Sequence, residues 1–277
     1  MVIAPANHAV SSLSGTRNER VPELDGIRGL AILSVVVWHY VALRFAPPPG
    51  SVLALFWPLL ALTWSGVDLF FVLSGFLIGG ILLEHRESPN YFQTFYARRV
   101  CRIIPLYYLL LLGCWIGICA GLAERSPGWK WLFANPMPFW SYVVFAQNSF
   151  MMQEGDFGAN ALAVTWSLAI EEQFYLVFPW LVRYVPRTRL IYVFFGTIAV
   201  APLCRILFYL YHPIPLSGSF FFMPSRLDAF GLGAFGGLRS TLRGDTGSPA
   251  SILQRALRFI SASVCGLPGD VFRDAGR

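Results

Sequence analysis

Six apolar stretches, each long enough to cross a membrane as a helix, constrain this sequence of 277 residues more than any other feature. They lie at roughly 27–45, 65–83, 101–123, 162–183, 189–211 and 219–238. About 20 apolar residues span the ~30 Å hydrocarbon core of a bilayer as a helix. Helices satisfy their own backbone hydrogen bonds there. The sequence therefore predicts an all-α, polytopic transmembrane bundle of about six spans.

Composition supports a membrane protein and argues against a nucleic-acid partner. Hydrophobic residues make up 56% of the chain and charged residues only 13%, far from a soluble average. The net charge of +6 comes almost entirely from arginines, which cluster at the ends of apolar stretches. Five cysteines form no CxxC pair, so the sequence indicates neither a disulfide framework nor a metal site.

Charge asymmetry predicts how the spans are oriented. The stretches 52–64 and 129–152 are also apolar, but the first is short and the second contains Pro136 and Pro138. We interpret both as interfacial or re-entrant. With the N-terminus in the cytoplasm, twelve arginines then lie at cytoplasmic ends, against Arg44, Arg125 and Lys130 outside. This distribution follows the positive-inside rule.

Arg28 and His39 are the most informative polar pair. Eleven residues are close to three helical turns, so both side chains share a face, ~16 Å apart along the axis. If Arg28 sits at one edge of the hydrocarbon layer, His39 lies near its middle. An ionisable group at that depth is a candidate functional residue, although a buried His bonded to a backbone carbonyl is an alternative.

A second polar motif lies in the fourth stretch. The segment Ser167-Leu-Ala-Ile-Glu171-Glu172-Gln173-Phe174-Tyr175 places two carboxylates and an amide inside a span. Ser167, Glu171 and Phe174/Tyr175 share a helical face. Glu171 is then either paired with a cation, protonated, or part of a structural interhelical salt bridge. Asp68, Arg226 and Asp228 are further charges within or beside the apolar stretches.

Arginines precede the third stretch in the segment Arg98-Arg99-Val-Cys-Arg102. Arg99 and Arg102 share a helical face, and such a fork suits phosphate groups because guanidinium binds them bidentately. Anchoring the helix to anionic lipid is the alternative.

Glycine spacing indicates close helix packing. Gly75 and Gly79 form one GxxxG motif, and Gly113, Gly117 and Gly121 form two overlapping ones. Gly231-Leu-Gly233-Ala-Phe-Gly236 matches the dinucleotide fingerprint, but no predicted strand precedes it, which argues against nucleotide binding.

Together these residues resemble membrane acyltransferase family 3, the bacterial integral-membrane sugar and glycan O-acyltransferases. The matching motifs are Arg28-x10-His39, Val67-Asp68-Leu69-Phe70-Phe71 continuing to Ser74-Gly75-Phe76, Arg99-x-x-Arg102 before Pro105, Ser167-Leu-x-x-Glu171 with Phe174-Tyr175, and, more weakly, Arg226-Leu-Asp228-Ala229. The resemblance covers about residues 20 to 240.

The resemblance implies transfer of an acyl group, commonly acetyl, from acyl-CoA to a hydroxyl of a carbohydrate or glycolipid. No permanently bound cofactor is expected; acyl-CoA is a substrate that the enzyme meets on the cytoplasmic side of the bacterial inner membrane. His39 would be the general base, since imidazole titrates near neutrality. Arg28 would hold polar parts of the donor, and Glu171 would orient His39 or balance a cation. Arg99 and Arg102 would meet the CoA phosphates.

Three regions follow from this reading. Residues 1–22 form a cytoplasmic N-terminal tail, 23–243 the transmembrane acyltransferase domain, and 244–277 a polar C-terminal tail. The family usually has about ten spans, so the resemblance implies that 23–243 is the N-terminal part of the family domain, in a C-terminally truncated chain.

Two other classes of function fit intramembrane Arg, His and Glu. A membrane transporter would use them as a proton or solute pathway and would show uptake in vesicles without acyl-CoA. A non-catalytic membrane scaffold would tolerate replacement of His39.

Overall fold

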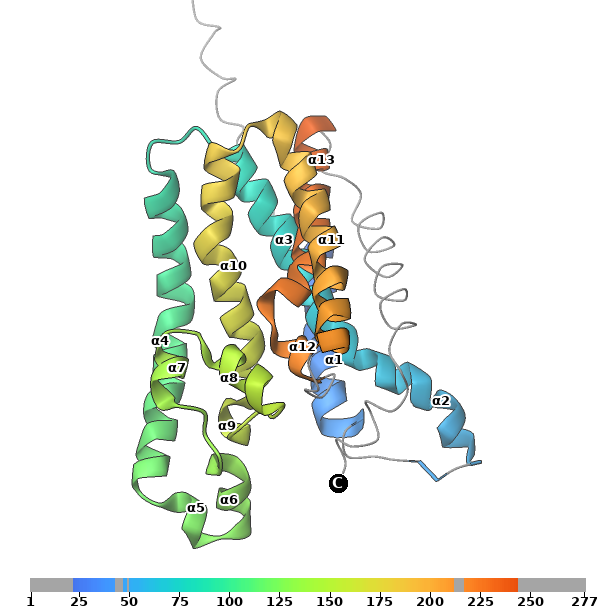
Figure 1. The fold of residues 1–277 in the computed structure, drawn as a ribbon, viewed down its shortest axis with the longest axis vertical. Coiled ribbons are helices and arrows are strands. Elements are labelled where there is room, and N and C mark those ends of the chain that lie inside the picture. The colour runs from blue at the N-terminus through green and yellow to red at the C-terminus, as the bar shows by residue number, and fades with distance from the viewer. Residues whose placement is uncertain (1–21, 43–46, 49, 212–216, 244–277) are drawn as a thin grey trace, which may run out of the picture.

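The structure, a computed structural model, describes residues 22–42, 47–48, 50–211 and 217–243, all of whose regular elements are helices (Figure 1). The elements in chain order are α1 (Pro22–Val37), η1 (Trp38–Ala42), α2 (Val52–Ala61), η2 (Leu62–Ser65), α3 (Gly66–Glu84), α4 (Tyr91–Cys119), α5 (Leu122–Arg125), α6 (Pro127–Phe133), α7 (Phe139–Val143), α8 (Gln147–Glu154), α9 (Asn160–Ala163), α10 (Thr165–Tyr184), α11 (Arg187–Tyr211), α12 (Ser217–Phe221), η3 (Met223–Arg226) and α13 (Leu227–Arg243). Apart from Pro22, the predicted tails lie outside the described residues.

Six long helices of the described chain, α1, α3, α4, α10, α11 and α13, form the predicted all-α bundle (Figure 1). Within the described residues, four segments are long and apolar enough to cross a membrane: Leu24–Ala42, Ala54–Glu84, Tyr91–Cys119 and Arg187–Tyr211. The remaining two long helices are α10, which carries Glu171 and Glu172, and α13, which has 17 residues. The chain is therefore a helical membrane protein.

The two ends of the bundle differ in character. The α3–α4 and α10–α11 connections are short and lie at one end, beside the C-terminal end of α13 (Figure 1). The opposite end carries α5, α6 and α9, while α2 projects sideways from it (Figure 1). At the first end, Arg86 donates to the Arg183 carbonyl and Arg187 donates to the Leu83 carbonyl. These hydrogen bonds tie the two connections together at the arginine-rich end.

The apolar segment 129–152 does not form a spanning helix, as expected. It is divided among α6, α7 and α8, and Asn135 and Phe145 adopt positive φ at the breaks. The Tyr107 hydroxyl, in the interior of α4, donates to the Tyr142 carbonyl across 2.8 Å. Gln147 donates to the Thr165 carbonyl across 3.0 Å. The segment is therefore a run of short helices, and polar side chains from α4 and α8 hold it in place.

The third and sixth predicted spans have other limits in the structure. The third begins at Tyr91 rather than 101, so Arg98 and Arg99 lie inside α4 instead of preceding the span. The sixth span, predicted at 219–238, is broken around Pro224 into α12, η3 and α13. A proline removes a backbone donor and starts a helix more readily than it continues one.

Glycines bring α3 and α13 into backbone contact, as the first GxxxG motif predicted. A Cβ added at Gly75 would collide with the Phe230 backbone, and one at Gly79 would lie 3.2 Å from Ala234 Cα. From the other side, Gly233 faces the Val72 carbonyl, and a Cβ at Gly237 would lie 2.9 Å from the Phe76 carbonyl. We call Gly75, Gly79, Gly233 and Gly237 the glycine seam.

The GxGxxG pattern on α13 also serves helix packing. A Cβ added at Gly231 would collide with the Thr197 side chain of α11, and one at Gly233 would collide with the Val72 carbonyl of α3. These glycines therefore have a packing role, which removes any basis for a dinucleotide fingerprint.

The overlapping GxxxG motifs of α4 have another role. A Cβ added at Gly113 would have no described neighbour within 4 Å, whereas one at Gly117 would lie 2.9 Å from the ring of Phe133 on the short helix α6. Gly121 follows the end of α4 with a φ of +63°. These motifs therefore do not bring the α4 backbone against another long helix of the described chain.

Tyrosine hydroxyls join α4 to α10. Tyr91 donates to the Pro179 carbonyl across 3.0 Å, and Tyr96 donates to the Leu176 carbonyl across 2.9 Å. The indole of Trp180 donates to the Tyr96 hydroxyl across 3.0 Å. Large aromatic side chains, rather than a close backbone approach, hold these two helices together.

Candidate functional site

Glu171 lies in the bundle interior, where two hydroxyl groups hold its carboxylate. It is 7% exposed. Ser74, on α3, donates to Oε1 across 2.6 Å, and Tyr175, one turn further along α10, donates to the same oxygen across 2.8 Å. A buried carboxylate is costly unless such donors or a nearby cation compensate it.

Two arginines act on Glu171 electrostatically, although neither forms an ion pair with it among the described contacts. Arg99 of α4 stacks over the Tyr175 ring at 4.6 Å from its centroid and over Phe95 at 5.7 Å. The guanidinium groups of Arg99 and Arg28 both interact electrostatically with Glu171. The structure thus brings together Arg28, Arg99 and Glu171 from three helices that the sequence could not place side by side. We call these three residues with Ser74 and Tyr175 the charge cluster.

Glu172 adjoins the charge cluster and was not assigned a role from the sequence. It interacts electrostatically with Glu171 and Arg99. Its Oε1 is buried and has no hydrogen-bond partner among the described residues. The sequence does contain a signal for Glu172: it follows Glu171 directly, and two consecutive residues of a helix point to adjoining faces.

Arg102 is not part of this cluster. It is exposed on α4, as is Arg98, whereas Arg99 is half-buried. The predicted fork of Arg99 and Arg102 therefore has one inward-facing and one outward-facing member.

His39 lies in the π-helical turn η1, which follows α1 directly. Its Nδ1 is 2.8 Å from the Val35 carbonyl oxygen. A carbonyl can only accept, so Nδ1 carries the proton of the neutral ring and Nε2 presents a lone pair. The ring is half-buried. π-turns recur at functional sites because they re-aim a side chain.

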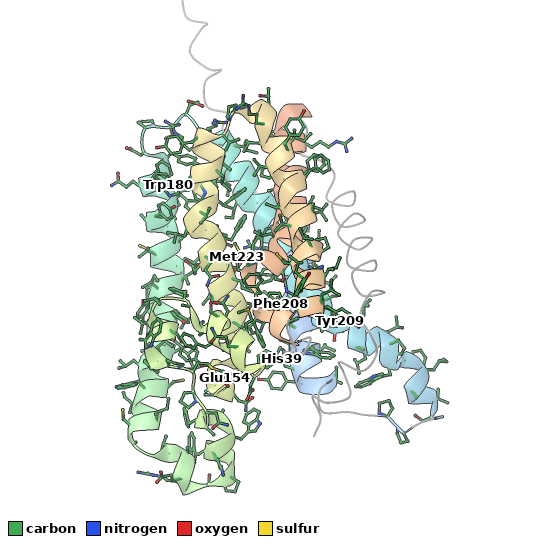
Figure 2. The ribbon with its side chains drawn as sticks, in the orientation of Figure 1. His39, Glu154, Trp180, Phe208, Tyr209 and Met223 are labelled. Carbon is green, nitrogen blue, oxygen red and sulfur yellow. The ribbon has the colours of Figure 1, made fainter. Side chains whose placement is uncertain are left out.

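The packing of α1 against α3 sets the levels of Arg28 and His39 along the bundle. A Cβ at Gly66, the first residue of α3, would lie 2.7 Å from the Ala31 carbonyl and 2.9 Å from Ser34 Cβ. The middle of α1 is therefore level with the start of α3. Arg28 precedes this level in the chain and acts electrostatically on the buried Glu171. His39 lies in the half of the bundle that carries α9 (Figure 1 and Figure 2). The helix begins at Pro22, earlier than its apolar stretch, which shifts its register against α3.

The described contacts of Glu171 include Arg28 but not His39. Arg28, not His39, interacts with Glu171, and eleven residues of α1 and η1 put about 16 Å between the levels of Arg28 and His39. The described hydrogen bonds of Glu171 and of His39 do not join them. The expected orientation of His39 by Glu171 has no counterpart in these contacts.

A second group of charges lies where α3, α11 and η3 meet. Arg226 donates to Asp68 across 2.9 Å, and Arg205 donates to Asp228 and to the Ser225 carbonyl, each across 2.6 Å. Arg226 also lies 4.1 Å from the Phe220 ring centroid and 5.9 Å from those of Trp64 and Trp166. The sequence pointed to Asp68, Arg226 and Asp228 as misplaced charges but missed Arg205, whose signal was a cation inside an apolar helix.

No cluster of three or more His, Cys, Asp or Glu side chains suited to a metal ion occurs in the part of the chain that the structure describes. The candidate reactive groups are an imidazole, a buried carboxylate and guanidinium groups.

An all-helical membrane bundle with these ionisable groups inside it is typical of integral-membrane proteins that carry a functional site within the bilayer. The family comparison identifies the class more closely. A family profile described as an acyltransferase domain, that of acyltransferase family 3, matches residues 21–268. The chain belongs to this family.

Curated relatives are similar over part of the chain. The peptidoglycan O-acetyltransferase OatA of Listeria monocytogenes is 34% identical over 167 residues, which are 57% of this chain and 24% of the relative. The putative peptidoglycan O-acetyltransferase YrhL of Bacillus subtilis is also 34% identical, over 57% of this chain and 23% of the relative. A putative O-acetyltransferase of Staphylococcus aureus, SACOL0978, is 30% identical over 57% and 24%.

The chain thus aligns with about a quarter of the length of these relatives. No solved structure matches it significantly.

Proposed function

We propose that this chain is a membrane-bound O-acyltransferase that moves an acyl group, acetyl in the first instance, from acyl-CoA to a hydroxyl of a carbohydrate or glycolipid. Membership of acyltransferase family 3 supports acyl transfer. The names of two relatives, which specify peptidoglycan O-acetylation, support acetyl as the group and a glycan as the acceptor. The observation that carries the mechanism is the hydrogen bond from His39 Nδ1 to the Val35 carbonyl.

That hydrogen bond suits His39 to act as the general base. With the proton fixed on Nδ1, Nε2 accepts the proton of the acceptor hydroxyl. The hydroxyl oxygen then forms a bond to the acyl carbonyl carbon, and the carbon–sulfur bond of the thioester breaks. The imidazolium returns its proton to the departing thiolate, which leaves as the free thiol and restores neutral His39.

The charge cluster is the proposed donor site. Arg28 and Arg99 supply guanidinium groups of the kind that bind phosphate bidentately. Glu171 balances their charge when no donor is bound, and Ser74 and Tyr175 hold its carboxylate in place. Arg102 faces outward, so its part in this proposal is to draw the anionic donor towards α4.

The proposed path of the acyl group follows from the separation of the two sites. The donor phosphates lie at the level of Arg28, and the reacting carbonyl must reach Nε2 of His39, about 16 Å further along the helix axis. A thioester at the end of a long flexible arm meets this requirement, because the phosphates and the reacting sulfur are far apart in such a donor.

We further propose that the chain lies in the bacterial inner membrane with its N-terminus in the cytoplasm. The arginine-rich end of the bundle would then face the cytoplasm, as the positive-inside rule requires. The end with α5, α6 and α9, whose basic residues are Arg125 and Lys130, would face outward.

A transfer assay with isotopically labelled acetyl-CoA and soluble glycan fragments tests the proposal. Reconstituted protein should release free CoA and place labelled acetyl mass on the glycan, and both signals should depend on His39. Proton-coupled uptake without acyl-CoA, with no labelled glycan, would favour a transporter instead. Mass spectrometry of envelope glycans with and without the gene would identify the natural acceptor.

A further inference from the structure

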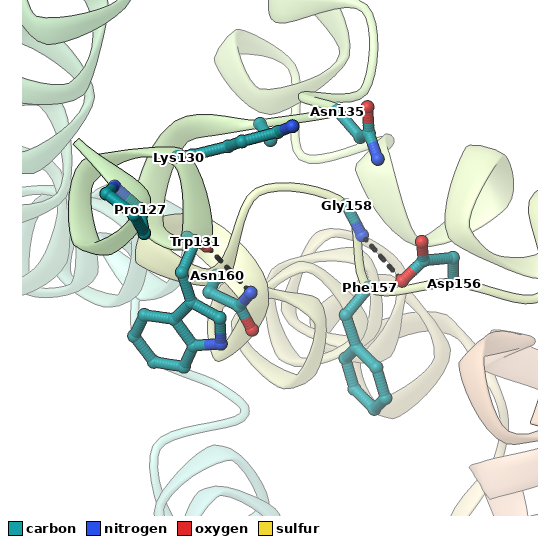
Figure 3. A pocket seen from close by; sticks show the side chains of 9 residues that line it. Pro127, Lys130, Trp131, Asn135, Asp156, Phe157, Gly158 and Asn160 are labelled. Carbon is teal, nitrogen blue, oxygen red and sulfur yellow. Dashed lines mark hydrogen bonds between the residues drawn. The ribbon is translucent and has the colours of Figure 1, made fainter. Parts of the chain in front are cut away.

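A pocket of about 430 Å³ opens between α6 and the loop that leads into α9 (Figure 3). Its lining includes Lys130, Trp131, Asn135, Asp156, Phe157 and Asn160. In Figures 1 and 2, α6 and α9 lie in the half of the bundle that holds His39. The pocket is therefore on the side from which an acceptor would approach His39, and none of its residues belongs to the charge cluster.

The lining combines flat apolar surface with hydrogen-bonding groups. The side chains of Trp131 and Phe157 are 53% and 41% exposed, and their rings point to the same side of the pocket (Figure 3). An amine, two amides and a carboxylate, from Lys130, Asn135, Asn160 and Asp156, surround them. Sites with this mixture fix a ligand by stacking one face and pairing its polar rim.

The frame of the pocket is fixed before any ligand arrives. Asn160 Nδ2 donates to the Trp131 carbonyl across 2.8 Å, which ties the start of α9 to α6. Asp156 Oδ1 accepts from the Gly158 amide across 3.3 Å. Gly158 has a φ of +68°, and an added Cβ would lie 3.0 Å from the Asn135 carbonyl, so this turn requires glycine. A preformed frame lowers the entropic cost of binding.

Polar atoms remain available within this frame. Among the described residues, no hydrogen bond engages Asp156 Oδ2, Asn160 Oδ1 or the Lys130 ammonium, and all three side chains are exposed. Together they offer two acceptors and a cationic donor around the pocket, a pattern that matches hydroxyl groups, which both donate and accept.

The chemistry distinguishes among ligands. A nucleotide phosphate would be repelled by Asp156 and would find one cation, Lys130, in place of an arginine fork. An acyl chain would offer no partner to Asp156 Oδ2, Asn160 Oδ1 or the Lys130 ammonium. A sugar ring has apolar C–H faces and a rim of hydroxyls, and it meets both kinds of lining group.

We propose that this pocket is a saccharide subsite that binds a sugar of the glycan acceptor outside the reaction centre. The Trp131 and Phe157 rings stack on the sugar faces, Asp156 and Asn160 pair with hydroxyls, and Lys130 pairs with an anionic or carbonyl substituent. The inference rests on the proposed function for the identity of the acceptor, but saccharide binding is measurable without any acyl donor.

The test uses the purified full chain in detergent and peptidoglycan fragments released by a muramidase, with binding followed by calorimetry. Trp131→Ala should weaken binding at least ten-fold, and Lys130→Ala should weaken it about three- to ten-fold. The matched control is Trp129→Ala: Trp129 is on the same helix, is 43% exposed and does not line the pocket. It should stay within two-fold of the wild type.

Folding and activity are scored separately. Size-exclusion profile and thermal midpoint must match the wild type for each variant; if Trp131→Ala fails this check, Trp131→Phe and Lys130→Ala decide the outcome. No saccharide binding by the wild type, or equal binding by the Trp131 and Lys130 variants, overturns the subsite. Saccharide binding that depends on Trp131, together with absent acetyl transfer, would retain the subsite and refute the proposed function.

Discussion

Ser74 and Glu171 are 97 residues apart in the chain, yet the Ser74 hydroxyl donates to the Glu171 carboxylate across 2.6 Å in the interior of the bundle. The contact joins α3 to α10 and fixes one oxygen of a carboxylate that interacts electrostatically with both Arg28 and Arg99. It therefore links helix packing to the geometry of the proposed donor site.

Ser74→Ala should destabilise the protein by ~1–3 kcal/mol, because it leaves a buried carboxylate oxygen with one donor instead of two. Denaturant titration in detergent measures the loss. Ser34→Ala is the matched control, since its exposed hydroxyl bonds only to the Leu30 carbonyl of its own helix. Equal stability of the two variants would show that Ser74 is dispensable to Glu171.

Asp68 and Arg226 should behave as an obligate pair. Removing one partner leaves a buried charge uncompensated, so Asp68→Ala or Arg226→Met alone should cost ~3–5 kcal/mol. The double variant should lose clearly less than the sum of the two. A double-mutant cycle of unfolding free energies measures the coupling, and strict additivity would mean that the 2.9 Å contact contributes nothing.

His39→Ala should cut turnover roughly 10²–10⁴-fold while the protein inserts normally, because a general base acts at the chemical step. Binding of acyl-CoA should be unchanged, since His39 is distant from the charge cluster. His39→Gln is the informative companion, because it keeps a polar side chain but no basic nitrogen, and it should be as inactive. Near-normal transfer by folded His39→Ala protein would refute the mechanism.

Arg28→Ala and Arg99→Ala should weaken acyl-CoA binding by ~1.5–3 kcal/mol each, the value of a charge-assisted contact. Arg102→Ala should weaken it less and with a stronger salt dependence, since its exposed charge acts through screened attraction. Arg125→Ala, beyond the far end of α4, is the control. Titration with a non-hydrolysable acyl-CoA analogue reports the affinities. An unchanged affinity in both the Arg28→Ala and Arg99→Ala variants would mean that these arginines only balance the charge of Glu171.

Cysteine labelling tests orientation. On a Cys-free background, Asn90→Cys should be labelled only from the cytoplasm, whereas Ser126→Cys and Glu154→Cys should both be labelled from outside. The reason is the concentration of arginines at the end that holds Asn90. Opposite labelling of Ser126→Cys and Glu154→Cys would mean that the segment 129–152 crosses the membrane.

Local patterns predicted the architecture well where composition changes sharply. The GxxxG motif of Gly75 and Gly79 predicted close packing correctly, because small residues permit it, whereas the overlapping motifs of α4 do not face another long helix of the described chain. The start of α4 at Tyr91 was missed because an apolar window ends at Arg98, while the helix continues with Tyr and Phe side chains that bond to α10. Pro224 was overlooked as the point where the sixth span breaks.

The candidate site was predicted as a set of residues but not as an arrangement. Helical periodicity placed Arg28 and His39 on one face, but His39 lies in the π-helical turn η1, where the α-helical period no longer applies. Periodicity could not reveal that Arg28, rather than His39, lies near Glu171, because that depends on how far α1 slides along α3. The saccharide subsite was invisible for the same reason: Trp131 and Asn160 become neighbours only through the turns around Asn135 and Gly158.

The glycine seam determines which part of the bundle can move. Where α3 meets α13, main chain touches main chain, so no rotamer can change to absorb a displacement, and the two helices must travel as one body. By contrast, α4 is attached to α10 through the ends of tyrosine and tryptophan side chains, which pivot. Arg99 lies on α4 and Glu171 on α10. A movement of α4 relative to α10 therefore changes the distance between these two charged groups.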